Sequence, residues 1–150
     1  MSERTLILIK PDGVQRGLVG RVIDRYESRG LRIAGLRLMH ADRSLAERHY
    51  AVHSDKPFFA GLIEFITSGP LVAMAVEGPK AIEVCRAING ATRPNEAAPG
   101  SIRGDLALET GMNIVHASDS PETAATELAL WFGDGELLDY ERAIDAWIIE

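Results

Sequence analysis

The sequence predicts an α+β protein: a ferredoxin-like α/β sandwich with a four-stranded antiparallel sheet (βαββαβ), added helices, a long loop before the last strand and a C-terminal tail. Short apolar segments that suit strands occur at residues 5–9, 31–39, 71–76 and 114–116. Segments with apolar residues at helical spacing separate them. With 150 residues, of which 46% are hydrophobic and 25% charged, the chain is expected to form a single domain over residues 1–150.

The first strand is predicted at residues 5–9, and a turn-rich cluster at residues 10–13 ends it. A helix is predicted over residues 19–29 from its apolar spacing, and Gly30 follows as a helix-ending glycine. Residues 31–39 largely alternate between apolar and polar, which favours a strand with one buried face and one solvent-exposed face.

Two helices are predicted before the next strand. Ser44 is expected to cap a short helix that runs to residue 49, with Glu47 at the capping-box position. Residues 57–66 favour a second helix, which a Ser-Gly-Pro sequence ends. The continuous apolar run at residues 71–76 then indicates a buried strand.

The second half contains a helix, a loop, a strand and a helix. Pro79 is expected in the first turn of a helix that ends near residue 88. Residues 90–104 are rich in loop formers, and loops of this length in compact domains are often functional. The last strand is short, at residues 114–116, and Ser120 begins a helix to about residue 131. The tail contains a helix-like piece near residues 139–147.

Composition narrows the class of protein. The one cysteine, Cys85, fits a reducing compartment, and the N-terminal apolar stretch at residues 6–9 is shorter than a signal-peptide core. No stretch approaches the length of a membrane span. We therefore predict a cytoplasmic protein without membrane attachment. A net charge of −6 argues against stable nucleic-acid binding, although a pocket can still gather basic residues around a small anion.

One histidine stands out as a candidate nucleophile. His116 ends an apolar run and precedes a turn and a capped helix, whereas His40, His49 and His53 lie at ordinary helical or charged positions. Glu127 is about two turns into the helix after His116. That helix can fold back, so a carboxylate that accepts a proton from one ring nitrogen would leave the other free to attack.

Basic and aromatic residues suggest what His116 would react with. Lys10, Arg86 and Arg103 stand at the ends of predicted elements and could converge on one anion. Phe58 could present a flat face to a base. The sequence contains no phosphate loop, dinucleotide fingerprint, protein-kinase motif or metal-spaced Cys/His cluster.

Four stretches of the sequence, taken together, are highly specific for one protein family. They are ERTLILIKPDGVQRGLVG at residues 3–20, HYAVHSDKPFFAGLIEFITSGPLVAM at residues 49–74, RPNEAAPGSIRGDLALETGMNIVHASDS at residues 93–120, and the ending ELLDY…AWIIE. Through them the sequence closely resembles the nucleoside diphosphate kinases over essentially its whole length. The resemblance implies a ping-pong transfer of the γ-phosphate of a nucleoside triphosphate, typically ATP, to histidine and then to a nucleoside diphosphate, with broad base specificity.

The resemblance also implies a role for each matching residue. His116 would be the phosphorylated nucleophile, with Tyr50 beside it and with Glu127 and Ser118 orienting it. The nucleotide would be held at its phosphates by Lys10, Arg86, Thr92 and Arg103, at its sugar by Asn113 and Lys10, and at its base by Phe58. No residue is expected to ligate a metal, since Mg²⁺ would arrive bound to the phosphates.

Family members are homo-oligomers, commonly hexamers and in some bacteria tetramers, so a homo-oligomer that binds ATP and other nucleoside di- and triphosphates is expected. Five residues depart from the usual pattern: Arg93, Thr110, Met112, Ala117 and Ile149. None of them removes a group that the mechanism needs, so activity is expected, and the departures bear on the kinetics and on the number of subunits. Two alternatives stay open at this point: a non-catalytic nucleotide-binding domain, and an interaction protein that docks a partner through residues 90–104.

Overall fold

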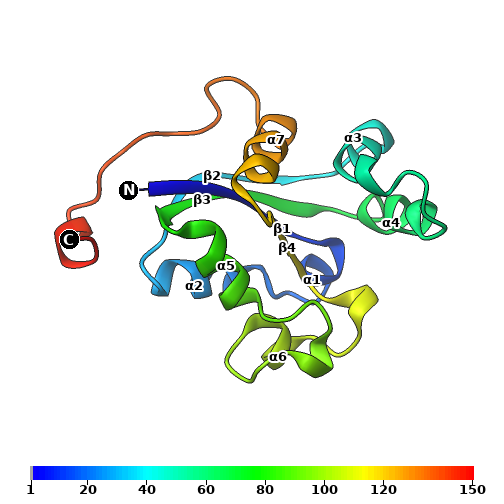
Figure 1. The fold of residues 1–150 in the computed structure, drawn as a ribbon, viewed down its shortest axis with the longest axis horizontal. Coiled ribbons are helices and arrows are strands. Elements are labelled where there is room, and N and C mark those ends of the chain that lie inside the picture. The colour runs from blue at the N-terminus through cyan, green and yellow to red at the C-terminus, as the bar shows by residue number, and fades with distance from the viewer. Residues whose placement is uncertain (1) are drawn as a thin grey trace.

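A computed structural model describes residues 2–150, and its core is one antiparallel sheet (Figure 1). The strands are β1 (Ser2–Ile9), β2 (Arg32–Met39), β3 (Leu71–Pro79) and β4 (Val115–Ala117). Their order across the sheet is β2-β3-β1-β4, which places β1 and β3 in the middle. This is the four-stranded α+β arrangement predicted from the sequence.

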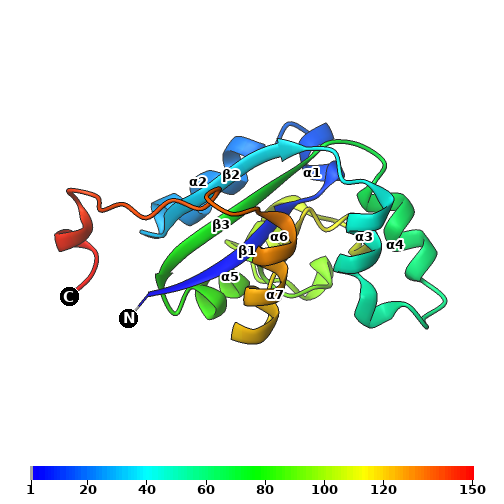
Figure 2. The same cartoon turned by 90° about the horizontal axis from the view of Figure 1, so that it is seen from above.

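Helices cover both faces of the sheet (Figures 1 and 2). One face carries α3, α4 and α7, and the other carries α1, α2, α5 and α6. The bounds are α1 (Pro11–Gln15), α2 (Val19–Ser28), α3 (Arg43–His49), α4 (Phe59–Ile66), α5 (Ala81–Asn89), α6 (Ile102–Leu106) and α7 (Pro121–Trp131). Short 3₁₀ turns occur at Ala51–His53, Pro94–Glu96, Thr110–Met112 and Asp145–Trp147.

The two faces have separate cores because side chains alternate along a strand. In β1, Ile7 belongs to the core that contains Tyr26 of α2, whereas Leu8 belongs to the core that contains Trp131 of α7. Burial on both sides explains why residues 6–9 of β1 and residues 71–76 of β3 are apolar without interruption.

The register of β4 brings the last quarter of the chain to the end of β1. His116 lies opposite Leu8, and Val115 lies opposite Ile9. The backbone N–H of Lys10 donates to the carbonyl of Ile114 at 2.8 Å. Lys10 and His116, far apart in sequence, therefore meet at one end of the sheet.

The helix predicted from residue 19 begins there, as α2, but two other predictions in the first third of the chain were wrong. Residues 10–13 are not a free turn, because Pro11 begins α1 and a proline suits the first helical position. Ser44 lies inside α3, and its cap is Asp42, whose carboxylate accepts the N–H of Leu45 at 2.8 Å. Glu47 instead pairs with Arg43 at 2.7 Å.

Four later boundaries also differ from prediction. Pro79 ends β3, paired with Ser2, because the strand continues as far as its partner; α5 begins at Ala81. The predicted helix at residues 57–66 begins only at Phe59, and the predicted loop at residues 90–104 includes a 3₁₀ turn and the start of α6. Ile114 lies outside β4 with φ of 72°. The helix from Ser120 to Trp131 is confirmed, with Ser120 as its cap.

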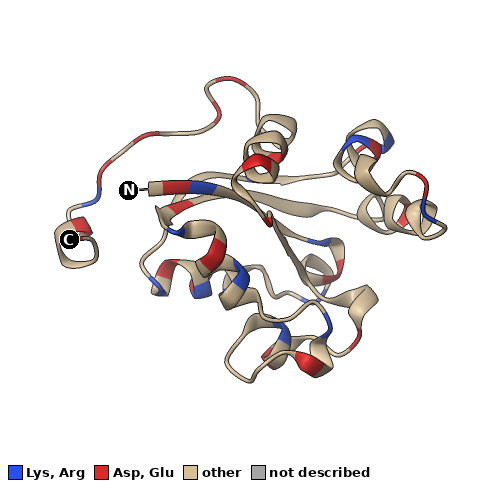
Figure 3. Cartoon of the chain, viewed as in Figure 1, with Lys and Arg blue, Asp and Glu red and all other residues tan. Residues whose placement is uncertain are grey.

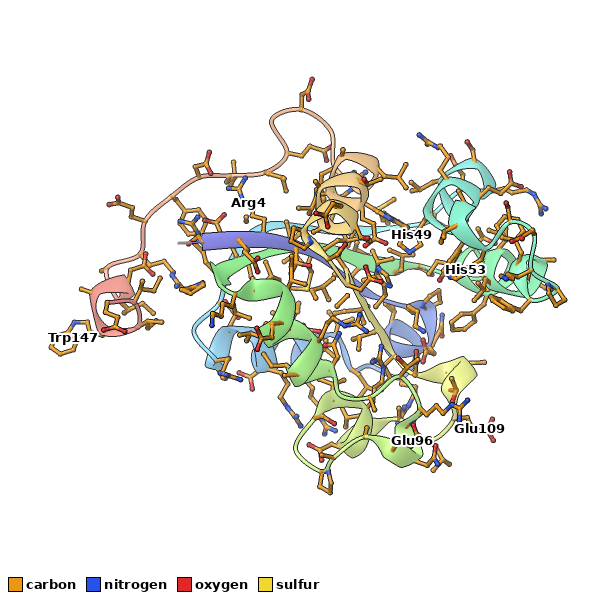
Figure 4. The ribbon with its side chains drawn as sticks, viewed as in Figure 1. Arg4, His49, His53, Glu96, Glu109 and Trp147 are labelled. Carbon is orange, nitrogen blue, oxygen red and sulfur yellow. The ribbon has the colours of Figure 1, made fainter. Side chains whose placement is uncertain are left out.

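The C-terminal tail is extended and contains a 3₁₀ turn at Asp145–Trp147 instead of the helix predicted there. Arg142 anchors it by donating to the carbonyls of Gly30 and Leu31. Trp147 is 90% exposed and points away from the body (Figure 4). No helix within residues 2–150 combines the length and the apolar character needed to cross a bilayer.

Candidate active site

A cavity of about 760 Å³ opens where β1 ends and β4 begins. One wall comes from the segment between α3 and α4 with α4 itself, and the other from α5, α6 and the loops beside them. Figure 4 labels His53 on the first wall, and it labels Glu96 and Glu109, which do not line the cavity, on the loops beside the second. The lining includes these residues with predicted roles: Lys10, Tyr50, Phe58, Arg86, Thr92, Arg103, Asn113 and His116.

His116 is held from one side by Glu127. Its Nε2 lies 2.9 Å from Oε1 of Glu127, and the same oxygen accepts the hydroxyl of Ser118 at 2.6 Å. Burial alone would raise the pKa of Glu127, but the hydrogen bonds and charge of His116 and the bond from Ser118 lower it. An ionised carboxylate only accepts, so Nε2 of His116 donates to it, and in the neutral ring Nδ1 then keeps its lone pair.

His49 and Trp131 form a second layer behind this pair, which the sequence interpretation missed. The indole N–H of Trp131 donates to Nδ1 of His49 at 3.0 Å, and the His49 ring meets the His116 ring edge-on at 4.7 Å. Burial, followed by the nearby His116, lowers the pKa of His49 to about 3. His49 is therefore a neutral packing partner. A histidine at the end of an amphipathic helix gives no local sign of this role.

Tyr50 lies beside the same group, with its ring 4.7 Å from that of His49. Burial, and then the charge of Glu127, raises the pKa of Tyr50 to about 12. Its hydroxyl therefore stays protonated near neutral pH and can donate a hydrogen bond in the cavity.

Lys10 presents its ammonium group to the cavity. It contacts Oδ1 of Asn113 and lies 5.7 Å above the ring of Phe65. Burial lowers the pKa of Lys10 to about 8, while Asp12 opposes this effect and Arg103 adds to it. The amide of Asn113 also donates to the carbonyl of Thr92 at 2.9 Å, which ties the loop after α5 to the end of β1.

The two arginines differ in how they are held. Arg103 is only 8% exposed and donates to the carbonyls of Asn113, Gly90 and Val115. Arg86 is exposed and donates to the carbonyl of Ala117 at 3.2 Å. A guanidinium has five N–H donors, so both keep donors for an anion in the cavity.

Phe58 is 50% exposed at the rim of the cavity, and it precedes the first residue of α4. An exposed ring at a cavity mouth offers a flat face for stacking. Among the departures from the family pattern, Arg93, Thr110 and Ala117 also line the cavity, whereas Met112 is exposed on the loop before β4.

The cavity is locally positive in a negative chain. None of its described lining residues is Asp or Glu, although the chain has a net charge of −6. Acidic residues recur instead along the extended tail (Figure 3). This distribution suits an anionic ligand.

One group of side chains has the composition of a metal site. His49, His116 and Glu127 each offer a ligand atom, and these atoms lie within 4.8 Å of one another. Hydrogen bonds already occupy them, since Trp131 donates to His49 and Glu127 accepts from His116. The group therefore works as a hydrogen-bond network.

A cationic cavity with an exposed aromatic rim and a histidine oriented by a carboxylate defines a nucleotide phosphotransferase. The family model described as nucleoside diphosphate kinase matches residues 3–137. A nucleoside diphosphate kinase from Thermomicrobium roseum is 60% identical over 147 residues, covering 98% of this chain and 99% of that protein. The chain belongs to the nucleoside diphosphate kinase family, and it is an enzyme of that kind.

Solved structures support the same family assignment. That of a halophilic nucleoside diphosphate kinase from Halobacterium salinarum in complex with CDP has a TM-score of 0.97 and 48% identity, covering 100% of both chains. A transition state mimic of the Borrelia burgdorferi enzyme with bound vanadate and ADP has a TM-score of 0.91 and 37% identity, covering 97% of this chain and 96% of that one.

Proposed function

We propose that the enzyme transfers the γ-phosphate of a nucleoside triphosphate, typically ATP, to a nucleoside diphosphate through a phosphohistidine on His116. The observation that carries the proposal is the orientation of the His116 ring. Glu127 occupies Nε2, so Nδ1 is the nitrogen left to attack. The cavity that His116 lines contains four cationic side chains, Lys10, Arg86, Arg93 and Arg103, of which all but Arg93 are matched to the family's phosphate-binding residues.

In the first half-reaction, Nδ1 of His116 attacks the γ-phosphorus. A nitrogen–phosphorus bond forms, the bond from phosphorus to the bridging oxygen breaks, and its electron pair leaves on the nucleoside diphosphate. The ring gains positive charge as the bond forms, and ionised Glu127 stabilises this charge through Nε2–H. In the second half, a terminal oxygen of another diphosphate attacks the phosphorus and Nδ1 leaves with its electron pair.

The other residues hold the nucleotide. Arg86, Arg103 and Thr92 would bind phosphate oxygens, with Lys10 between the phosphates and the sugar and Asn113 at the sugar. Phosphoryl transfer depends mainly on such positioning and charge neutralisation. Phe58 would stack on the base, and every base has a flat face, so broad base specificity follows.

We also propose Mg²⁺ as the metal. The described lining of the cavity has no carboxylate, so the ion would take its ligands from the phosphates and from water. When bound, it neutralises phosphate charge. CDP in the Halobacterium salinarum structure and ADP with vanadate in the Borrelia burgdorferi structure support a nucleotide in this cavity.

Three further parts of the proposal follow the family pattern. Residues 1–150 form one domain, which two cores sharing one sheet support. The enzyme is a cytoplasmic homo-oligomer, a hexamer or a tetramer. Light scattering tests the oligomer directly, because a stable species of 16.3 kDa would be a monomer.

The labelling experiment tests the reaction. The protein is incubated with γ-labelled ATP and Mg²⁺ and is then separated from nucleotide. We expect an acid-labile, base-stable label that passes to any added nucleoside diphosphate. His116→Ala should take up no label, whereas the matched control His40→Ala should be labelled normally, because His40 is exposed and bonds to the carbonyl of Thr67 outside the cavity. A wild-type protein that binds ATP but takes up no label would instead be a non-catalytic nucleotide-binding domain.

A further inference from the structure

The backbone just before His116 is strained. Ile114 is fully buried and has φ of 72°, which is rare for a β-branched residue. The N–H of Val115 donates across it to the carbonyl of Asn113 at 2.8 Å. A hydrogen bond between residues two apart, with positive φ between them, is a γ-turn of the rare, strained kind.

Contacts from distant parts of the chain hold this turn. The carboxylate of Asp12 accepts the N–H of Ile114 at 3.0 Å through Oδ2. The carbonyl of Ile114 accepts the backbone N–H of Lys10 at 2.8 Å. Arg103 donates to the carbonyls on both sides of the turn, those of Asn113 and Val115. Strained residues persist only where their surroundings over-determine them, and they gather at active sites.

Helix α1 packs closely against the side chain of Ile114 in this turn. A Cβ on Gly13 would lie 2.8 Å from Cγ2 of Ile9 and 3.0 Å from Cγ2 of Ile114. Glycine at this position therefore lets α1 approach the side chain of Ile114 closely. The same helix carries Asp12, so the packing that brings Gly13 against Ile114 also brings the carboxylate to its amide.

The turn lies between two parts of the site. On one side is Asn113, whose amide contacts Lys10 and Thr92. On the other side, two residues after Ile114, is His116. A change in the turn would shift His116 relative to the residues proposed to hold the nucleotide.

We propose that Asp12 is a positioning residue for phosphoryl transfer, because its carboxylate holds the Ile114 amide and thereby keeps the strained turn and His116 in place. The proposal rests on the role of His116 proposed above. Oδ2 makes the bond to Ile114, and the buried Oδ1 has no hydrogen-bond partner within residues 2–150. The hydrogen bonding of Asp12 is thus directed at this turn.

Asp12 also supplies a negative charge near Lys10. Two substitutions separate the charge from the acceptor. Asp12→Asn keeps an acceptor oxygen at the same reach and removes the charge. Asp12→Glu keeps the charge and moves the acceptor by one methylene. Asp12→Ala removes both. If the alanine variant does not fold, the other two still decide the question.

The measurement is the single-turnover rate of His116 labelling at saturating ATP, with ATP affinity and Tm measured alongside. A misplacement of about 1 Å costs about 100-fold in rate. We expect Asp12→Ala and Asp12→Glu to label about 100-fold more slowly than wild type. Asp12→Asn should stay much closer to wild type in rate, even where its affinity for ATP falls.

Asp42→Ala is the matched control. Asp42 makes the same kind of bond, a carboxylate accepting a backbone N–H at 2.8 Å, but at the start of α3 and outside the cavity. It should lower the Tm and leave the labelling rate unchanged. A similar loss of rate in Asp42→Ala would overturn the proposal, because general destabilisation would then explain both.

Three other results would also overturn it: labelling by Asp12→Ala within a few-fold of wild type, labelling by Asp12→Asn as slow as that of Asp12→Ala, and labelling by Asp12→Glu as fast as wild type. Failure of the proposed function looks different, since the wild-type protein itself would then carry no label on His116.

Discussion

Replacing Arg103 with alanine should reduce stability as well as activity, whereas replacing Arg86 should reduce activity alone. Arg103 donates to the carbonyls of Gly90 at 2.8 Å, Val115 at 2.6 Å and Asn113 at 3.2 Å. Arg86 is exposed and donates to one carbonyl, that of Ala117. Both side chains line the cavity, so both are expected to bind phosphate.

The size of the stability loss depends on which carbonyl groups still accept a hydrogen bond once the Arg103 side chain is removed. The oxygen of Asn113 still accepts the N–H of Val115 after the substitution, so the loss falls mainly on Gly90 and Val115. A buried polar group left without its partner costs about 1–3 kcal/mol. We therefore expect Arg103→Ala to lower the free energy of unfolding by about 3 kcal/mol, which corresponds to a Tm lower by about 6–12 °C.

The assay is urea unfolding of wild type, Arg103→Ala and Arg86→Ala at one fixed protein concentration, because assembly makes stability depend on concentration. Steady-state kinetics of the same samples give the activity. Removing a donor that stabilises transition-state charge costs about 10²–10³-fold in kcat, which we expect for both variants.

Arg103→Lys provides a further comparison, since an ammonium group keeps the charge but cannot reach three separated carbonyls. It should recover part of the activity and little of the stability. The reasoning would be refuted if Arg103→Ala were as stable as Arg86→Ala, or if Arg103→Lys were as stable as wild type.

Three other predictions concern charge and pH. Burial lowers the pKa of Lys10 to about 8, so the KM for nucleotide should rise as the pH increases through 8, and Lys10→Arg should flatten this profile; an unchanged profile in Lys10→Arg would contradict it. Burial lowers the pKa of His49 from 6.5 to about 3, so only the unfolded chain binds a proton there between these values. Stability should therefore fall below pH 6.5, by up to about 1.4 kcal/mol per pH unit from this residue. Urea unfolding from pH 7 to pH 5 tests this, and His49→Gln should show a shallower slope. Arg93 is an exposed cation at the cavity, so Arg93→Asn should raise the KM for ATP a few-fold at low salt, with kcat unchanged and the difference lost in high salt; a difference that persists in high salt would count against a charge effect.

The fold could be predicted largely from local patterns. Apolar runs located the strands, and helical spacing located the major helices, because burial of one face dictates both periodicities. The predicted ends of strands and helices were wrong where pairing with another strand, or a capping residue, sets the boundary. Pro79 stays in β3 because Ser2 pairs with it, and Asp42 caps α3 in place of Ser44.

Some residues of the candidate site were predicted from the sequence and others were missed. His116 and Glu127 were chosen together because the chain order allows a helix to fold back on a strand, and their contact is 2.9 Å. His49 was set aside as an ordinary helical residue. Its contact with Trp131 joins residues 82 positions apart, and no local pattern carries information at that range.

The sequence by itself determined the fold class, the family and the kinds of side chain available for chemistry, because these depend on composition, periodicity and motif. Only the tertiary structure decided which nitrogen of His116 is free and that Ile114 adopts a positive φ. The intrinsic preference of isoleucine disfavours that conformation. Contacts from Asp12, 102 positions away, and from Arg103 hold it, and such contacts exist only once the sheet and its helices have assembled.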